Sequence, residues 1–181
     1  ESIMEKIKAG LKEYQLEAMF NYTIKYEGAR DNAFDTIVAS GENATILHYI
    51  ENKDTIKDGD LVLFDLGADY DHYCGDISRT LPVNGSFSPR QRSLYNIVLK
   101  AQEEVIRSIK PGIDYSKLNE IAKKTLAEGC IEIGLIKGEE EISNYYYHGV
   151  SHYLGLDTHD IGNRDRKLEA GMVITVKPGL Y

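Results

Sequence analysis

The spacing of apolar residues along the chain of 181 residues predicts a mixture of helices and strands. Apolar side chains recur every three to four positions from Tyr14 to Ile24, the period of a helix with one buried face. Further along, Ser88 with Gln91 three positions later is typical of a capping box at a helix start. The expected helices cover residues 2–8, 13–27, 88–110 and 115–135.

Shorter apolar runs bounded by turn residues predict strands. These are expected at residues 33–40, 45–49, 61–67, 72–81 and 172–176. The strands 61–67 and 72–81 are close enough in sequence to form a hairpin, and a two-residue tip at Tyr70-Asp71 places Asp65 directly opposite Asp76. The mixture of helices and strands predicts the α+β class.

Two segments of the chain recur in the same order. The stretch Ile7–Leu11 returns as Ile109–Ile113, and the stretch Gly59–Gly67 matches Gly171–Gly179. The first pair predicts a repeated helix start and the second a repeated strand. We therefore expect two related α+β halves facing each other across a pseudo-twofold axis.

Composition narrows the class of protein. The 29 acidic residues exceed the 21 basic ones, and the net charge of −8 argues against nucleic acid and anionic membranes as partners. No apolar run approaches the roughly 18 residues of a membrane span, so we expect a soluble, cytoplasmic protein. Cys74 and Cys130 lie far apart and are interpreted as thiols in a reducing compartment. The chain opens within a helical pattern and ends at Tyr181 after a strand-like run, which suggests a piece of a longer protein.

Asp65 is the first candidate for chemistry, because it interrupts the apolar run from Leu61 to Leu66. Burying a carboxylate without a partner is costly. Two carboxylates that face each other repel unless they share a proton or a cation, so Asp65 with Asp76 indicates a metal or catalytic site. The alternatives are a solvated hairpin tip, or pairing of the two acids with Arg79.

Three of the five histidines lie close together, at positions 148, 152 and 159. A zincin-type motif is excluded because Gly149 stands where H-E-x-x-H needs glutamate. Imidazole combined with carboxylates suits manganese, cobalt, iron or zinc. The alternative is a surface loop rich in tyrosine and histidine that begins at Tyr145.

Taken together, these segments resemble the Xaa-Pro aminopeptidase and Xaa-Pro dipeptidase (prolidase) family over nearly the whole chain. The matching motifs are Leu47-His48-Tyr49, Phe64-Asp65-Leu66-Gly67, Cys74-Gly75-Asp76, His148-Gly149-Val150-Ser151-His152, Asp157-Thr158-His159 and Val176-Lys177-Pro178-Gly179. The resemblance implies an α+β pita-bread fold that is truncated at its C-terminus. It implies one catalytic-type domain over residues 1–181, without the family's N-terminal domain, in a homo-oligomer such as a dimer.

The resemblance also implies a site. Asp65, Asp76 and His152 match metal ligands for two divalent ions, manganese first, with cobalt, zinc or iron as alternatives. His148 and His159 match catalytic residues, and both line the substrate pocket with His48. The implied substrate is a peptide with proline at the second position.

Lys177 departs from the family pattern, which has a glutamate ligand at this position. A further glutamate ligand is expected beyond Tyr181. An ammonium group near two metal ions opposes their binding, so we expect this chain to bind metal poorly and to be nearly inactive. We hypothesise that Lys177 pairs with Asp65 and Asp76 in place of the metals. The alternatives are a metal-free pseudoenzyme or peptide-binding module, and a creatinase-like hydrolase that shares the fold without metal.

Overall fold

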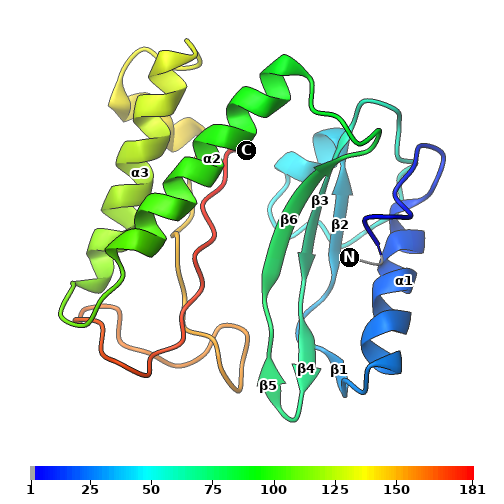
Figure 1. The fold of residues 1–181 in the computed structure, drawn as a ribbon, viewed down its shortest axis with the longest axis horizontal. Coiled ribbons are helices and arrows are strands. Elements are labelled where there is room, and N and C mark those ends of the chain that lie inside the picture. The colour runs from blue at the N-terminus through cyan, green and yellow to red at the C-terminus, as the bar shows by residue number, and fades with distance from the viewer. Residues whose placement is uncertain (1–2) are drawn as a thin grey trace. The chain divides into compact units, whose positions relative to one another are not determined.

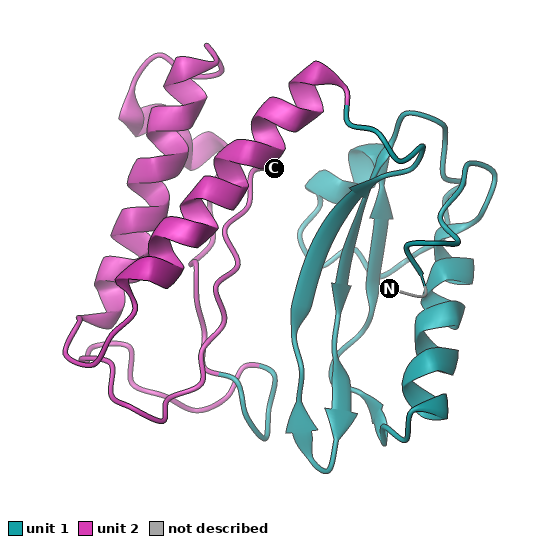
Figure 2. Cartoon of the chain, in the orientation of Figure 1, with its two compact units in different colours: residues 1–87, 154–158 teal, residues 88–153, 159–181 magenta. Residues whose placement is uncertain are grey.

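A computed structural model describes residues 3–181, which divide into two compact units (Figure 2). Unit 1 extends to Phe87 and also includes residues 154–158, and unit 2 holds residues 88–153 and 159–181. Unit 1 contains α1 (Glu13–Tyr26), β1 (Asp31–Asn32), β2 (Ile37–Ser40), the 3-10 helix η1 (Gly41–Thr45), β3 (Leu61–Leu66), β4 (Ala68–Tyr70), β5 (Tyr73–Cys74) and β6 (Ile77–Pro82). Unit 2 contains α2 (Pro89–Ser108), α3 (Tyr115–Glu132) and the 3-10 helix η2 (Glu139–Asn144).

Unit 1 is built on an antiparallel sheet in the order β2-β3-β6, with α1 packed against it (Figure 1). Leu16 on α1 is fully buried and shares a core with Val62 and Phe64 on β3. Residues on one strand alternate between its faces, so Asp65 stands on the face away from this core. The sheet therefore holds Val62 and Phe64 against α1 and places Asp65 on the opposite face, which has a small core of its own around Ile37, Ala39 and Tyr49.

The hairpin that carries the two aspartates has a different register from the predicted one. Its tip is Asp71-His72, where φ is 50° and 69°, and Tyr70 pairs with Tyr73. Two left-handed residues are what a two-residue type I′ turn requires. Asp65 consequently faces Ser78, so the predicted direct pairing with Asp76 is wrong. A shift of two residues keeps side chains on the same face, whereas a shift of one would have reversed them.

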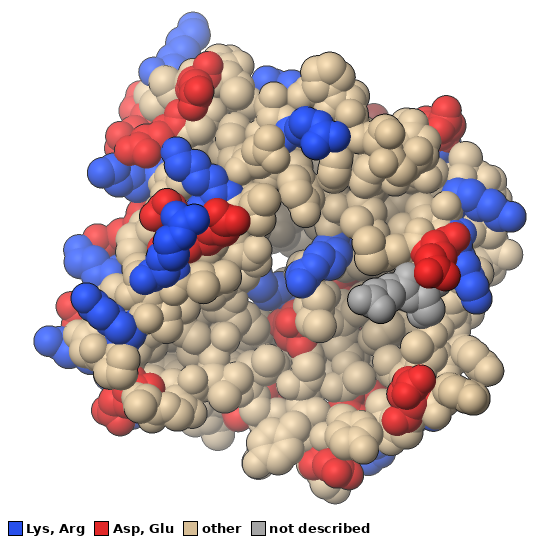
Figure 3. Space-filling view, viewed as in Figure 1, with Lys and Arg blue, Asp and Glu red and all other residues tan. Residues whose placement is uncertain are grey.

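Unit 2 packs α2 against α3 around a separate core that includes Leu118, Leu126 and Val150 (Figure 1). The capping box is confirmed: Gln91 N donates to Ser88 Oγ at 3.3 Å, and Ser88 N donates to the Gln91 side chain at 2.9 Å. Acidic and basic side chains are mingled over the surface of these helices (Figure 3). Such exposed pairs, for example Arg107 with Glu103 at 2.7 Å, each contribute less than about 1 kcal/mol.

Three other predictions of regular structure are wrong. The segment predicted as a helix over 2–8 forms only a turn at residues 3–6, with residue 2 outside the described part. Such a short segment cannot repay the cost of starting a helix. The strand predicted at 45–49 is excluded by the left-handed backbone of His48. The segment 172–176 is extended, but a single bridge between Tyr153 and Ile174 is too little to count as a strand. Of the predicted strand 33–40, only Ile37–Ser40 is a strand, because residues 33–34 form a bend.

The repeat predicted from sequence is visible in the hydrogen bonds of the two units. In unit 1, Gly10 N donates to Ile56 O at 2.9 Å; in unit 2, Gly112 N donates to Leu168 O at 2.8 Å. Bridges between Lys12 and Thr55 and between Asp114 and Lys167 correspond in the same way. The residues before the helices differ by 102 positions between the units, and their partners differ by 112 positions. These are the offsets of the two sequence repeats. The chain just before α1 in unit 1 and the chain just before α3 in unit 2 are therefore bonded to a later segment of the same unit in the same way.

Glu13, the first residue of α1, is completely buried. Burial alone would raise the pKa of its carboxyl group, but hydrogen bonds from Ser40, Asp54 and Asn43 hold the pKa below its usual value. A carboxyl group with a lowered pKa stabilises the folded state above the pKa of the unfolded chain. This stabilisation is lost as the pH falls through the pKa of the folded state.

We expect Glu13→Gln to lower the free energy of unfolding most at neutral pH. The difference from the parent chain narrows as the pH falls below about 4.5, where the carboxylate of the unfolded chain becomes protonated. Urea denaturation between pH 3 and 7 measures this difference. A difference that is constant with pH would contradict the contribution assigned to the carboxylate. The exposed residue Glu27 provides a control, because Glu27→Gln removes an acid without disturbing a buried hydrogen-bond network.

Candidate functional site

The two aspartates occupy one face of the β3–β6 hairpin. Asp65 is half-buried and its Oδ1 accepts a hydrogen bond from Ser78 Oγ at 2.7 Å. In this register Asp76 lies opposite Gly67, the residue that directly follows β3. Gly67 is two positions after Asp65, so Asp65 and Asp76 are diagonal neighbours. Diagonal neighbours on one face of an antiparallel pair are within reach of each other's side chains. The face shared by Asp65 and Asp76 is called the aspartate face below.

Arg79 does not pair with the two aspartates, which was one alternative from the sequence. It pairs with Phe64, so strand alternation places it on the face opposite the aspartates. Its guanidinium donates to the carbonyl of Ser78 at 2.7 Å. The alternative in which Arg79 neutralises the two acids is therefore not supported.

The aspartate face depends on a close approach of Gly67 to the backbone of Gly75 where the ladder is interrupted. A Cβ atom on Gly67 would lie 2.1 Å from the carbonyl oxygen of Gly75 and 2.5 Å from the ring of Phe34. No side chain fits at that distance, so Gly67 permits the close approach of the two strands. A Cβ atom on Gly75 would meet its nearest neighbour at 3.6 Å, which is an ordinary contact.

The histidine-rich segment is divided between the units. His148, His152 and His159 belong to unit 2, while the intervening residues 154–158 belong to unit 1. In unit 1, Cys74 N donates to Gly155 O at 2.8 Å, and the Thr158 hydroxyl donates to Ala33 O at 3.1 Å. These bonds fix the segment that follows His152 to the strand that leads into Asp76.

His152 and His159 lie edge to face, with ring centroids 4.5 Å apart. Nδ1 of His152 lies 2.9 Å from the carbonyl oxygen of Tyr153, so this nitrogen carries the proton. In the neutral ring, Nε2 then bears the lone pair, which is the arrangement found in many metal-binding histidines. Its main-chain nitrogen also donates to Thr175 Oγ1 at 3.1 Å.

His148 is held between two aromatic rings. Its ring centroid lies 5.1 Å from that of Tyr146 and 5.2 Å from that of Tyr181, both edge to face. Asn119 on α3 fixes the chain on either side of it, because its Oδ1 accepts from Tyr146 OH at 2.6 Å and from Val150 N at 3.1 Å. Burial raises the pKa of Tyr146, so this hydroxyl stays protonated and donates. Nε2 of His148 is buried with no hydrogen-bond partner among residues 3–181, and an orphaned nitrogen of this kind is suited to a ligand.

Sequence reasoning identified His48 but not its backbone. His48 lies in unit 1 after η1, with an exposed side chain and φ of 57°. A left-handed histidine is uncommon. Sequence reasoning also missed the supporting roles of Asn119, Gly67 and Gly75. The position of Gly67 two residues after Asp65 could have signalled a close approach of the strands there.

Lys177 is half-buried, and its main-chain nitrogen donates to Val150 O at 2.7 Å. The sequence repeat matches it to Asp65, so the two units carry opposite charges at corresponding positions. The predicted pairing of Lys177 with the two aspartates stays a prediction.

The donor groups fit a divalent ion in their chemistry. Carboxylates and an imidazole whose Nε2 carries the lone pair are ligands for manganese, iron, cobalt or zinc. Within residues 3–181, however, no three histidine, cysteine, aspartate or glutamate side chains form a group that could hold a metal ion. Unit 1 by itself brings together two carboxylates of this kind, Asp65 and Asp76.

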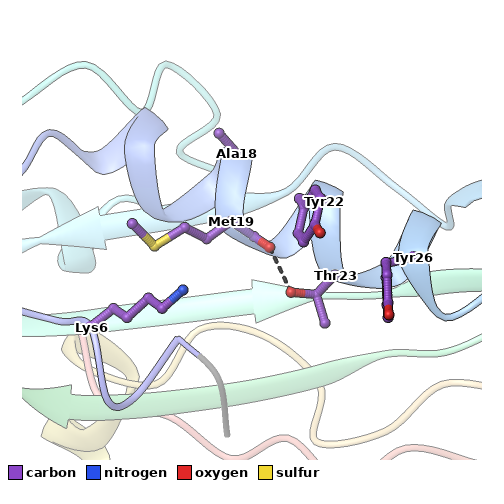
Figure 4. A pocket seen from close by; sticks show the side chains of 6 residues that line it. All are labelled: Lys6, Ala18, Met19, Tyr22, Thr23 and Tyr26. Atoms are coloured by element: carbon purple, nitrogen blue, oxygen red, sulfur yellow. Dashed lines mark hydrogen bonds between the residues drawn. The ribbon is translucent and has the colours of Figure 1, made fainter.

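A pocket elsewhere in unit 1 lacks these groups. It lies beside α1 and the N-terminal turn, measures about 400 Å³ and is shown in Figure 4. Its lining residues are Lys6, Ala18, Met19, Tyr22, Thr23 and Tyr26. The Thr23 hydroxyl in this lining donates to the Met19 carbonyl at 2.8 Å, so it is used within the helix. With neither carboxylate nor imidazole, it is no candidate for hydrolytic chemistry.

Carboxylates on one sheet face and clustered histidines are the donor groups of metal-dependent hydrolases. A model of metallopeptidase family M24 matches residues 1–181, and the chain belongs to this family. None of the helices within residues 3–181 is both long and apolar enough to cross a membrane.

Relatives in this family share sequence along the whole of the chain. It is 44% identical to the Xaa-Pro aminopeptidase of Escherichia coli K12 over 98% of its own length and 43% of that protein. It is 35% identical to the Xaa-Pro dipeptidase of Rattus norvegicus over 99% of its length and 42% of that protein. The chain thus spans 42–43% of the length of these two relatives.

Solved structures agree with the fold. A chain from Bacillus anthracis, provisionally assigned as an aminopeptidase P, is 60% identical with a TM-score of 0.95 over 97% of this chain and 42% of that chain. Alanine variants of Escherichia coli aminopeptidase P, one of them in complex with substrate, are 43% identical with a TM-score of 0.96 over 99% of this chain and 43% of those chains. Three of these variants replace a histidine and two aspartates that follow it by 17 and by 28 positions. The pita-bread fold implied by the resemblance is confirmed.

Close packing at Gly67 gives the first test of the aspartate face. We expect Gly67→Ala to lower the free energy of unfolding by about 2–3 kcal/mol, because the added methyl group forces the two strands apart. Gly75→Ala is the matched control, and we expect a change below about 1 kcal/mol. Urea denaturation of both variants measures the difference. Equal effects of the two substitutions would contradict the crowding described at Gly67.

Proposed function

We propose that the whole protein is a metal-dependent exopeptidase that hydrolyses the bond between an N-terminal residue and a following proline. The observation that carries this proposal is the aspartate face, with Asp65 and Asp76 side by side on one hairpin. His48, Asp65 and Asp76 are separated by 17 and 11 positions, the same spacing as the histidine and two aspartates replaced in the variants of the Escherichia coli enzyme. The spacing supports the assignment of all three residues.

Asp65, Asp76 and His152 are the proposed ligands of two divalent ions, with manganese as the preferred metal. The carboxylates favour hard ions, and the single imidazole suits manganese as well as cobalt, zinc or iron. When bound, such a metal pair supplies an activated water as nucleophile and polarises the scissile carbonyl group.

The histidines of the chain bind and orient the peptide in this proposal. Nδ1 of His148 lies 2.9 Å from the Gly149 carbonyl and donates to it, so Nε2 has a hydrogen to donate only in the cationic ring. In that form, His148 stabilises negative charge that develops on the carbonyl oxygen of the substrate. His159, packed against His152, and His48 complete the substrate-binding set.

Further properties follow from the resemblance. We propose a cytoplasmic homodimer that acts on peptides with proline at the second position. Cys74 and Cys130 are both free thiols in the structure, which supports a reducing compartment.

Lys177 favours a second candidate function, a metal-free module that binds proline-containing peptides. A lysine in place of the family's glutamate removes a ligand and changes the local charge by two. An ammonium group near Asp65 and Asp76 neutralises them electrostatically as a cation would. Such a module keeps His48, His148 and His159 for binding without hydrolysis.

The charge at position 177 separates the two candidates. In the protein extended beyond Tyr181 to the length of its relatives, we expect Lys177→Glu to raise bound manganese toward two ions per chain and to give cleavage of an Xaa-Pro peptide. The unsubstituted protein binds manganese at least tenfold more weakly. Metal analysis after dialysis and a peptide-hydrolysis assay measure both effects.

Lys167→Glu is the matched control, because it makes the same change of charge at an exposed position of unit 2. We expect it to leave both metal content and hydrolysis unchanged. If Lys177→Glu binds no manganese and cleaves nothing, the peptidase proposal is wrong. Proline-peptide binding without metal in that case would support the binding module.

A further inference from the structure

The segment that carries His48 has no regular secondary structure, yet its backbone is strained at two positions. His48 and Asn52 have φ of 57° and 44°, in the left-handed region that residues other than glycine rarely adopt. Strained backbone persists only where surrounding contacts hold it, and it is concentrated at functional sites. The contacts that hold residues 48–54, which we call the His48 loop, therefore indicate what the loop is for.

The carboxylate of Glu13 is the centre of these contacts. Its Oε2 accepts hydrogen bonds from Tyr49 OH at 2.8 Å and from Asp54 N at 2.9 Å, so one oxygen binds both ends of the His48 loop. Its Oε1 accepts from Ser40 N and Ser40 Oγ, each at 2.7 Å, and from Asn43 Nδ2 at 3.2 Å. One buried carboxylate thus ties the loop to the end of β2 and to η1.

A second anchor comes from the same helix. Asn52 is 2% exposed, and its side chain donates to Glu17 Oε2 at 2.9 Å and to Thr36 O at 2.8 Å. Its Oδ1 accepts from Val38 N on β2 at 2.9 Å. Glu13 and Glu17 lie one turn apart on α1, so the same helix that covers the sheet also supports the strained loop.

We propose that Glu13 is a positioning residue that holds His48 in its binding orientation through Tyr49. This inference rests on the proposed function, in which His48 contacts the peptide. Tyr49 is the direct neighbour of His48, and its bond to Glu13 fixes the chain immediately after the strained residue. Five donors converge on Glu13, and only a carboxylate, with two acceptor oxygens and no hydrogen, satisfies them all.

The titration behaviour of the pair agrees with this geometry. Burial, together with the hydrogen bond to Glu13, raises the pKa of Tyr49 to about 12. Tyr49 therefore remains a donor at neutral pH, and Glu13, with its lowered pKa, remains an acceptor. Both groups therefore keep the protonation states that this hydrogen bond requires at neutral pH.

Tyr49→Phe tests the proposal with little risk to folding, because it removes one hydroxyl and keeps the buried ring. We expect amide hydrogen exchange in residues 48–54 to become at least tenfold faster, while α2 and α3 keep their protection. With histidine labelled at the ring carbons, we expect the NMR signal of His48 to move toward that of a free histidine. Glu13→Gln produces the same changes to a greater extent.

Tyr22→Phe is the matched control, since Tyr22 is 69% exposed in the same unit and does not contact Glu13. It leaves both measurements unchanged. If Tyr49→Phe alters neither exchange in the loop nor the His48 signal, the proposal is wrong. An equal loss of protection throughout unit 1 would also overturn it, because the effect would then be one of general stability.

Kinetics connect the loop to binding. In the extended protein with Lys177→Glu, we expect Tyr49→Phe to raise the KM for an Xaa-Pro peptide about tenfold and to change kcat less than twofold. If Tyr49→Phe speeds amide exchange in the His48 loop but leaves KM unchanged, the role of Glu13 in positioning His48 for binding is wrong. If the protein without Tyr49→Phe cleaves no such peptide, the proposed function fails, while exchange and the His48 signal still decide whether Glu13 holds the loop.

Discussion

The pairing of β3 with β6 decides which residues of unit 1 can act together. Val62 and Phe64 must face α1 because they form its core, and strand alternation then forces Asp65 onto the other face. The register of the hairpin brings Asp76 to the same face, at the interruption that Gly67 makes possible. A burial requirement on one side of the sheet therefore places two carboxylates on the other side.

Sequence reasoning succeeded where a feature depends on periodicity. The three long helices and the strand around Asp65 follow from apolar spacing, the capping box follows from the spacing of Ser88 and Gln91, and the structure contains each of these. It failed where tertiary contacts override local preference. The pairing of Asp65 with Asp76 was wrong by two residues because the left-handed backbone of Asp71 and His72 moves the hairpin tip. Aspartate and histidine adopt this backbone more often than most residues, but the preference is too weak to decide between neighbouring tips. The face of each aspartate was nevertheless correct, since a slip of two residues preserves it.

The candidate site was less predictable than the fold. A motif identifies His48, Asp65 and His152, but it gives no information on what holds each side chain. The supports are polar residues distant in sequence, such as Glu13 beneath the His48 loop and Asn119 beside His148. Both lie on helices whose apolar faces had accounted for the sequence pattern. A buried glutamate at a helix start looks the same in sequence as an exposed one, so only the structure distinguishes them.

The two units show that a repeated scaffold need not repeat its chemistry. The same backbone bonds fix α1 and α3 to the chain that follows, from Gly10 in unit 1 and from Gly112 in unit 2. Yet the first residue of α1 is Glu13, a buried acceptor of five hydrogen bonds, and the first residue of α3 is Tyr115, a buried aromatic ring. Asp65 and Lys177 differ in the same manner at matched strand positions. Backbone hydrogen bonds do not depend on side chains, so they can stay constant while individual positions change charge. A change of charge such as that from Asp65 to Lys177 at matched positions is therefore compatible with the same backbone arrangement in both units.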